Sequence, residues 1–164
     1  MRFKNILLLL TLIISTINGL AQVSEKDIVY KWESGDIENK IIMLILNDSI
    51  TQKFIPSINE IKLAKELSIN YIDSLEKNRN YEVIKKYGKI LKYKHKNYYR
   101  QYAGYINTKG EKIIIINACC SEFKQHVNLE KNWLLVMDGG SCFFKIKVNI
   151  QNKRCHDFSV NGEA

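Results

Sequence analysis

The spacing of apolar residues changes along this chain, and that change constrains the fold more than any single motif does. Between residues 57 and 77 apolar side chains recur every three or four positions, which is the spacing of one helix face. Between residues 142 and 150 they recur every second position, as in a half-buried strand. One long helix followed by an antiparallel β-sheet predicts an α+β fold, in which one helix face packs on the sheet.

The predicted helix has a defined start after Pro56, the only proline of the chain. The Ser57 hydroxyl can accept a hydrogen bond from the Glu60 amide while the Glu60 side chain reaches back, which is a capping box. We therefore expect a helix over residues 57–77, ended by residues 78–80. Its apolar stripe consists of Ile61, Ala64, Leu67, Tyr71, Ile72 and Leu75.

The strands are predicted from turn residues that separate apolar segments. The clearest pair is a hairpin of residues 98–106 and 111–118, because the intervening turn ends in Gly110, which adopts positive φ readily. Three further strands follow in the prediction, at residues 133–137, 142–150 and 154–160, with bends at 138–140 and 151–153. Two short strands precede the helix in the prediction, at residues 28–32 and 41–46, with turn residues 33–36 between them.

The first 21 residues have the pattern of a secretory signal peptide. Arg2 and Lys4 precede a short apolar core, residues 6–14, and Gly19-Leu20-Ala21 supplies a cleavage site after Ala21. That core is shorter than the roughly 20 residues that span a bilayer, so we expect no transmembrane anchor. We expect residues 22–164 to form one α+β domain that is exported to the periplasm or beyond the cell.

Four cysteines in an exported chain predict at least one disulfide bond. Cys119 and Cys120 are adjacent, and a disulfide between them would form a strained ring. The possible partners of each are therefore Cys142 and Cys155. Strand parity places Cys120 and Cys142 on the core-facing side of their strands. We therefore predict a disulfide between Cys120 and Cys142, which leaves Cys119 and Cys155 either paired or free.

Cysteines, histidines and one glycine-rich segment could also serve in a catalytic or metal site and not only in the fold. The residue types that bind zinc or form a Cys-His pair are Cys119, Cys120, His126, Cys155 and His156. Their spacing lacks the C-x2-C or H-x3-H clip of a structural zinc site. The segment DGGSC at 138–142 lacks the G-x-S-x-G pattern of a nucleophile elbow, so we interpret it as a bend. We expect no cofactor and no metal.

A basic, tyrosine-rich stretch is the strongest surface candidate in the sequence. Its cations are Lys85, Lys86, Lys89, Lys92, Lys94, Lys96 and Arg100, interleaved with Tyr87, Tyr93, Tyr98 and Tyr99. Such a stretch can bind polyanions through charge and ring stacking. The alternative, which we favour, is a solvated connection whose tyrosines pack on the core. Abundant Lys, Ile and Asn also fit a chain encoded by A/T-rich codons, so the charge of +8 is weak evidence for a polyanion partner.

Three segments and the chain end carry a resemblance to known proteins. They are FIPSINEIKLAKE at 54–66, YYRQYAGYINTKGEKIIIIN at 98–117, WLLVMDGGSCFFKIKVN at 133–149 and the terminal NGEA. Over about residues 54–164 the chain resembles a group of uncharacterised small exported bacterial proteins, which implies export and a shared fold but no activity. Its layout is also similar to PepSY-like and cystatin-like domains, which implies binding through loops or a sheet face.

These observations favour a non-enzymatic binding module over an enzyme. No paired carboxylates, Ser-His-Asp order or metal clip stands out, and the ligand is expected to be an envelope or extracellular protein or a glycan. One alternative is a small exported thiol- or His-dependent enzyme, which should gather His126 or His156 with a cysteine or carboxylate in one concave pocket. A second alternative is a polyanion-binding surface protein.

Overall fold

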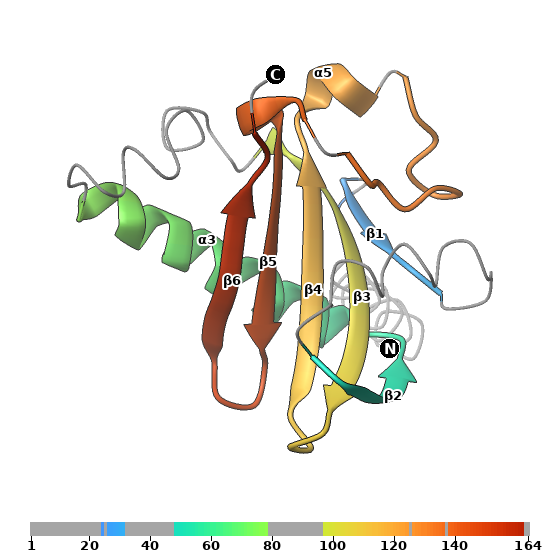
Figure 1. Cartoon of the computed structure of the whole chain (residues 1–164), viewed down its shortest axis with the longest axis vertical. Helices are drawn as coiled ribbons and strands as arrows, with labels where there is room; N and C mark the ends of the chain where they lie inside the picture. Colours follow the sequence, from blue (N-terminus) through green and yellow to red (C-terminus); the bar gives the residue numbers. More distant parts are fainter. Residues whose placement is uncertain are drawn as a thin grey trace, which may run out of the picture.

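The computed structural model describes residue 24 and residues 26–31, 48–78, 97–124, 126–136 and 138–162. In this part of the chain, one long helix, α3 (Ile58–Lys77), lies across one face of a mixed, mostly antiparallel sheet (Figure 1). The α+β prediction is therefore confirmed. The sheet consists of β1 (Asp27–Val29), β2 (Ile50–Phe54), β3 (Tyr99–Asn107), β4 (Lys112–Cys119), β5 (Phe143–Asn149) and β6 (Arg154–Val160).

Strands β3 to β6 form an antiparallel meander, and two N-terminal strands share the outer edge of β3. β1 runs parallel to β3 with Asp27 opposite Arg100, whereas β2 runs antiparallel with Phe54 opposite Gly104. A Cβ atom at Gly104 would lie 2.6 Å from the Phe54 ring, so the absence of a side chain there lets the ring pack on β3. β1 and β2 therefore cover successive halves of one strand.

The helix begins as the capping box predicts. The Glu60 amide donates to the Ser57 hydroxyl at 3.4 Å, and the Ser57 amide donates to the Glu60 carboxylate at 2.8 Å. At the other end the Asn78 amide donates to the Ser74 carbonyl, which closes the last turn. The predicted helix and its start are therefore confirmed.

The core between helix and sheet follows the predicted apolar stripe. Ile61, Ala64 and Ile72 are almost fully buried, and Leu67, Tyr71 and Leu75 pack around them. Their partners are the helix-facing residues of the sheet, which alternate along each strand as the sequence predicts. These sheet residues are Tyr98, Tyr102, Ile114, Ile116, Ala118, Phe144, Ile146, Val148 and Phe158.

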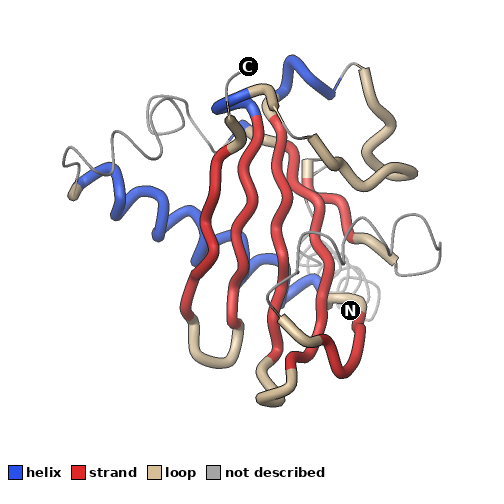
Figure 2. Tube along the Cα trace, in the orientation of Figure 1, coloured by secondary structure: helices blue, strands red, loops and turns tan. Residues whose placement is uncertain are grey.

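The opposite face of the sheet is covered by the segment between β4 and β5. It starts with the single turn α5 (Ser121–Lys124) and continues as loop (Figure 2). The strand predicted at 133–137 is wrong for the described residues 133–136, which join no strand ladder. Trp133 and Leu134 are 1% and 7% exposed, so their apolar character reflects packing onto the sheet and not strand formation.

The remaining predictions divide into confirmed and untested ones. The β3–β4 hairpin, with Gly110 at φ 75°, is confirmed, and so are β5 and β6. β1 matches the first predicted short strand in part. The second short strand at 41–46, the turn at 33–36 and the signal peptide lie outside the described residues, and β2 was not predicted. Among the described helices none is long and apolar enough to cross a membrane.

Candidate ligand-binding site

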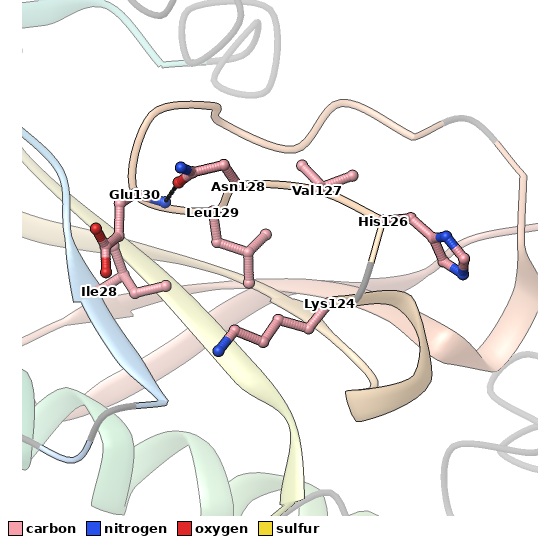
Figure 3. Close-up of a pocket in the computed structure, with 7 residues that line it drawn as sticks. All are labelled: Ile28, Lys124, His126, Val127, Asn128, Leu129 and Glu130. Atoms are coloured by element: carbon pink, nitrogen blue, oxygen red, sulfur yellow. Dashed lines mark hydrogen bonds between the residues drawn. The ribbon is translucent and has the colours of Figure 1, made fainter.

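A pocket of about 430 Å³ lies where β1 meets the segment after α5 (Figure 3). We call it the loop pocket. Val127, Leu129 and Ile28 supply its apolar surface, while its polar groups come from the loop. The lining residues are Ile28, Lys124, His126, Val127, Asn128, Leu129 and Glu130. Of these, only His126 was singled out from the sequence, because the pocket depends on tertiary contacts that no local pattern records.

Two buried amide side chains of the sheet hold the loop that walls this pocket. The Gln101 Nε2 atom donates to the carbonyls of Leu129 and Asn132 at 2.8 and 2.7 Å. The Gln101 Oε1 atom accepts from the Leu134 amide at 3.0 Å, and Asn117 Nδ2 donates to the Leu134 carbonyl at 2.7 Å. These side chains satisfy backbone groups that a buried loop would otherwise leave unpaired. The loop is therefore fixed to the sheet.

Asn128 organises the rim of the loop pocket. Its Oδ1 atom accepts from the amides of Glu130 and Lys131 at 3.0 and 3.2 Å, which is an Asx turn. Its carbonyl accepts from the Asn132 amide at 3.0 Å. Leu129, within this turn, is 2% exposed and packs into the core beneath the loop. The turn thus presents polar side chains outward while one leucine anchors it.

Charged groups lie in and beside the loop pocket: Lys124 lines it, and Lys26, which does not line it, shares the Tyr99 ring with Lys124. The Lys124 Nζ atom lies 4.8 Å from the centroid of the Tyr99 ring, and the Lys26 Nζ atom lies 5.6 Å from the same centroid. Neither ammonium forms an ion pair within the described part of the chain. The Glu130 carboxylate lies beside Ile28, and His126 lies at the opposite end of the pocket (Figure 3).

A second polar cluster lies on the same face of the sheet, around Lys147. This side chain is 5% exposed, and its Nζ atom lies 2.9 Å from Asp48 Oδ2 and 2.8 Å from Asp157 Oδ2. The Tyr105 hydroxyl also donates to Asp48, at 2.5 Å. His156 stands opposite Lys147 in the β5–β6 register. We call these five residues the lysine cluster.

The electrostatics of the lysine cluster favour the charged forms. Burial alone would raise the pKa of Asp48, but hydrogen bonds from Tyr105 and Lys147 and the Lys147 charge hold it below its usual value. Burial alone would lower the pKa of Lys147, but the carboxylates of Asp157 and Asp48 raise it above its usual value. The cluster therefore links the loop before β2 to the β5–β6 pair through one ammonium shared by two carboxylates.

The same cluster contains the donor types of a metal site. One ligand atom from each of Asp48, His156 and Asp157 lies within 4.8 Å of the others. The Lys147 ammonium already bonds to both carboxylates, and it carries the positive charge that a metal ion would supply. The residues present therefore form a lysine-centred arrangement, which a divalent cation would have to displace.

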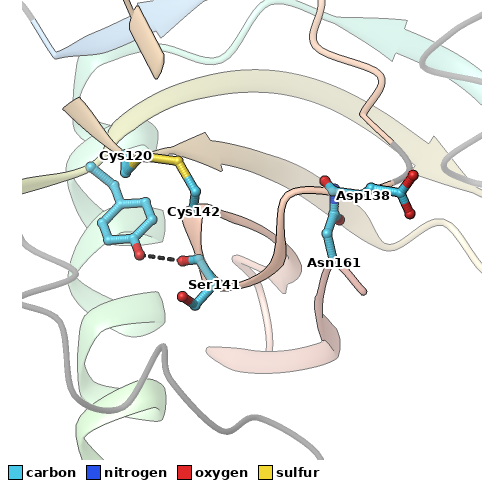
Figure 4. The surroundings of a disulfide bond; sticks show 6 residues. Cys120, Asp138, Ser141, Cys142 and Asn161 are labelled. Atoms are coloured by element: carbon cyan, nitrogen blue, oxygen red, sulfur yellow. Dashed lines mark hydrogen bonds between the residues drawn. A yellow bond between two sulfur atoms is a disulfide. The ribbon is translucent and has the colours of Figure 1, made fainter. Parts of the chain in front are cut away.

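The predicted disulfide is confirmed, because Cys120 and Cys142 are bridged with a Cα–Cα distance of 4.9 Å (Figure 4). The Cys120 amide also donates to the Cys142 carbonyl, so the bridge joins neighbouring chain segments at the ends of β4 and β5. The glycine-rich bend forms the short turn η3 (Gly140–Cys142), entered through Gly139 at φ 95°. It leads into β5 and contains no long helix that would direct a dipole at an anion.

The other two cysteines are unpaired and separated. Cys119 is fully buried on the loop-covered face, whereas Cys155 packs against the core beneath α3. Burial raises the pKa of each thiol to about 11. His156 points to the face opposite Cys155, toward the lysine cluster. Within the described residues, these cysteines and histidines therefore form neither a zinc site nor a Cys-His pair.

The polyanion surface that the sequence offers as an alternative loses its one described cation. Arg100 is 1% exposed, and its Nη1 atom donates to the Tyr98 carbonyl at 2.8 Å, so it belongs to the core and not to a surface. The reason is its position inside β3, beside the buried carboxylate of Asp27. The other six cations lie outside the described residues. They are Lys85, Lys86, Lys89, Lys92, Lys94 and Lys96.

Comparisons with models of protein families, with curated proteins and with solved structures find no match for this chain.

Proposed function

We propose that this chain is an exported, non-enzymatic binding module and that the loop pocket is its ligand site. The observation that carries the proposal is the anchoring of the loop that walls the pocket: Gln101 holds the lining residue Leu129, and Gln101 and Asn117 hold Leu134 further along the same loop. A wall fixed before the ligand arrives loses little conformational entropy on binding, which favours affinity. The pocket volume of about 430 Å³ also suits a small ligand or one unit of a polymer.

The state of the thiols favours binding over thiol chemistry. A thiol whose pKa is about 11 is almost entirely protonated at neutral pH, and the thiolate is the nucleophile. Neither Cys119 nor Cys155 lines the loop pocket. His156 does lie near two carboxylates, as the enzyme alternative requires, but Lys147 occupies both of them. We therefore rank the enzyme second.

Export is the second part of the proposal and rests on different evidence. The cleavage pattern at residues 1–21 and the Cys120–Cys142 disulfide both fit an oxidising compartment. The resemblance to small exported bacterial proteins over residues 54–164 belongs to the same proposal. It predicts that those proteins share the sheet, the helix and the disulfide described above.

The proposal is tested by ligand screening with NMR on the full chain produced in an exporting host. Separate additions of N-acetyl amino acids, dipeptides, neutral sugars and acidic sugars should include one class that shifts the amides of residues 126–130. Val127→Trp should fill the pocket and remove that response. Ile58→Trp is the matched control, because Ile58 is 50% exposed at the start of α3 and should leave the response intact. Binding that persists in Val127→Trp contradicts the proposed site.

A further inference from the structure

Lys124, which lines the loop pocket, and Lys26, which lies near the same Tyr99 ring, form an uncompensated pair of positive charges. Tyr99 packs in the same apolar cluster as the lining residues Ile28 and Val127. Because both ammonium groups lie near one Tyr99 ring, they are within about 10 Å of each other, roughly one Debye length at 0.1 M salt. Lys26 reaches the ring from the start of β1, and Lys124 reaches it from α5. The described part of the chain places no carboxylate in an ion pair with either of them. An anion bound between them would relieve their mutual repulsion.

The pocket next to this pair is not uniformly basic. Glu130 lines it with a carboxylate that accepts hydrogen bonds, and its backbone is held in place by Asn128. The Nδ2 atom of Asn128 is free to donate, since Oδ1 makes the hydrogen bonds of the Asx turn. Ile28 and Val127 supply apolar surface between these polar groups. The site therefore combines two ammonium groups, a carboxylate that can accept hydrogen bonds from hydroxyl groups, an amide that can donate one, and an apolar wall.

We propose that the loop pocket binds an acidic saccharide, with its sulfate or carboxylate group between Lys26 and Lys124. This inference rests on the proposed function of the pocket and names its ligand class. The sugar hydroxyls donate to the Glu130 carboxylate and accept from the Asn128 amide. The C–H face of the sugar ring packs on Ile28 and Val127. The two ammonium groups, the carboxylate, the amide and the apolar wall then each have a partner on one ligand.

The same features disfavour a nucleic acid. Single-strand binders stack bases on open aromatic faces, but two ammonium groups already lie over the Tyr99 ring. Glu130 would repel a phosphodiester that lay against it, and it has no cation among its described partners, whereas a sugar unit can present hydroxyl groups to it and keep its anionic group at the lysines. An acidic saccharide carries many hydroxyl groups beside its anionic groups, so it can use the Glu130 carboxylate and the Asn128 amide, which a sugar-phosphate backbone with few free hydroxyl groups cannot.

The test is isothermal titration of the full chain, produced in an exporting host, with four probes. They are a sulfated heparin tetrasaccharide, a tetragalacturonate, neutral maltotetraose and a ten-nucleotide oligo-dT. We expect binding of at least one acidic tetrasaccharide and none of maltotetraose. The sulfated and uronate probes distinguish which anionic group is preferred. Binding of oligo-dT as tight as that of the acidic sugars would overturn the inference.

Substitutions of the two lysines test whether their charges bind the acidic tetrasaccharide. Lys26→Gln/Lys124→Gln should weaken acidic tetrasaccharide binding about tenfold, because each lost contact of this kind accounts for a few-fold in affinity. Lys62→Gln/Lys109→Gln is the matched control with the same change in net charge. Lys62 is exposed on α3, and Lys109 lies in the β3–β4 hairpin, at the opposite end of the sheet from α5 (Figure 1). Equal weakening in both variants would overturn the inference.

Failure of this inference is distinguishable from failure of the proposed function. If no acidic saccharide binds while another compound class shifts the amides of residues 126–130, the ligand class is wrong and the pocket remains the site. If an acidic saccharide binds but shifts only amides outside residues 24–31 and 121–136, both proposals are wrong. Val127→Trp provides the second check, since it should abolish saccharide binding without a change of charge.

Discussion

Lys147 and Asp157 form an ion pair, Nζ to Oδ2 2.8 Å, although the register places His156 opposite Lys147. The contact depends on a β-bulge in β6, where the ladder shifts between Lys145 and Lys147. Asp157 adopts φ 52°, a left-handed conformation that aspartate tolerates better than most residues. The bulge therefore turns an edge residue toward a buried ammonium on the neighbouring strand.

Replacement of Lys147 should destabilise the fold. We expect Lys147→Met to lower the free energy of unfolding by about 2 kcal/mol, because Asp48 loses its buried cation. The loss is smaller than the roughly 3–5 kcal/mol of fully buried pairs, since the side chain of Asp157 is 52% exposed. Urea unfolding measures the change. Asp157→Asn should lower the free energy of unfolding less than Asp48→Asn does, because the Asp48 side chain is only 25% exposed. The reverse order would contradict this account.

The lowered pKa of Asp48 predicts a specific pH dependence. A carboxylate whose pKa is lower in the folded state than in the unfolded state stabilises the fold above its unfolded pKa, which is about 3.9. That stabilisation is lost as the pH falls through the folded pKa. The stability difference between the wild type and Asp48→Asn should therefore be largest at pH 6 and shrink below about pH 4. A difference that stays constant down to pH 2 would refute the assignment.

Removal of the Gln101 side-chain amide should release the wall of the loop pocket. Gln101→Leu leaves the Leu134 amide and the Leu129 carbonyl without their buried partner, so we expect a loss of about 2–3 kcal/mol. Hydrogen exchange of the Leu134 amide should accelerate more than that of the β4 amides. Asn152→Ala, which alters an exposed contact to Glu111, serves as the control and should change stability by less than about 0.5 kcal/mol.

The disulfide should be a major contributor to stability. Cys120→Ala/Cys142→Ala removes a bridge between residues 22 positions apart, and loop-closure entropy predicts a loss of about 3 kcal/mol. Cys155→Ala removes a half-buried free thiol and should lower the free energy of unfolding by less than loss of the disulfide does. Peptide mapping with iodoacetamide should label Cys119 and Cys155 only after unfolding, because both thiols are protonated at neutral pH. Labelling of Cys120 in the native exported protein would contradict the pairing.

Export predicts a shortened chain. The intact mass of protein recovered from an exporting host should correspond to residues 22–164, because Gly19-Leu20-Ala21 is the expected cleavage site. Substitution of Ala21 by Leu should slow cleavage, since signal peptidases require a small residue there. Exported protein that retains residues 1–21 would show that the segment is not a cleaved signal.

The sequence predicts the helix, the hairpin and the disulfide because each depends on local spacing. The capping box at Ser57 is complete within four residues. Cys120 and Cys142 are the next residues beyond the Cys119–Phe143 pair of the β4–β5 ladder, so strand parity extended by one position places them opposite each other. β2 was missed since its middle residues, Thr51 and Gln52, are exposed and polar, and the strand exists through its pairing with β3. Local patterns identify elements that bury their own apolar face.

The errors have a different physical cause. The apolar side chain of Trp133 packs onto the sheet from a loop and not from a strand. The neighbouring backbone carbonyl of Leu134 accepts a hydrogen bond from the Asn117 side-chain amide and not from a strand ladder. Arg100 belongs to a basic stretch in the sequence but faces the core, where Asp27 lies beside it. The loop pocket depends on β1 and residues 124–130, which are about 100 positions apart in the sequence. Only the assembled fold reveals such contacts.

The bulge at Asp157 also lies in a strand at the edge of the described sheet. β6 pairs with β5 and with no other strand in the described part of the chain, so it is the edge strand of the described sheet. A second copy that docked there would need evenly spaced partners, and the left-handed residue interrupts that spacing with an exposed carboxylate nearby. The edge therefore resists strand addition, which disfavours self-association into fibres.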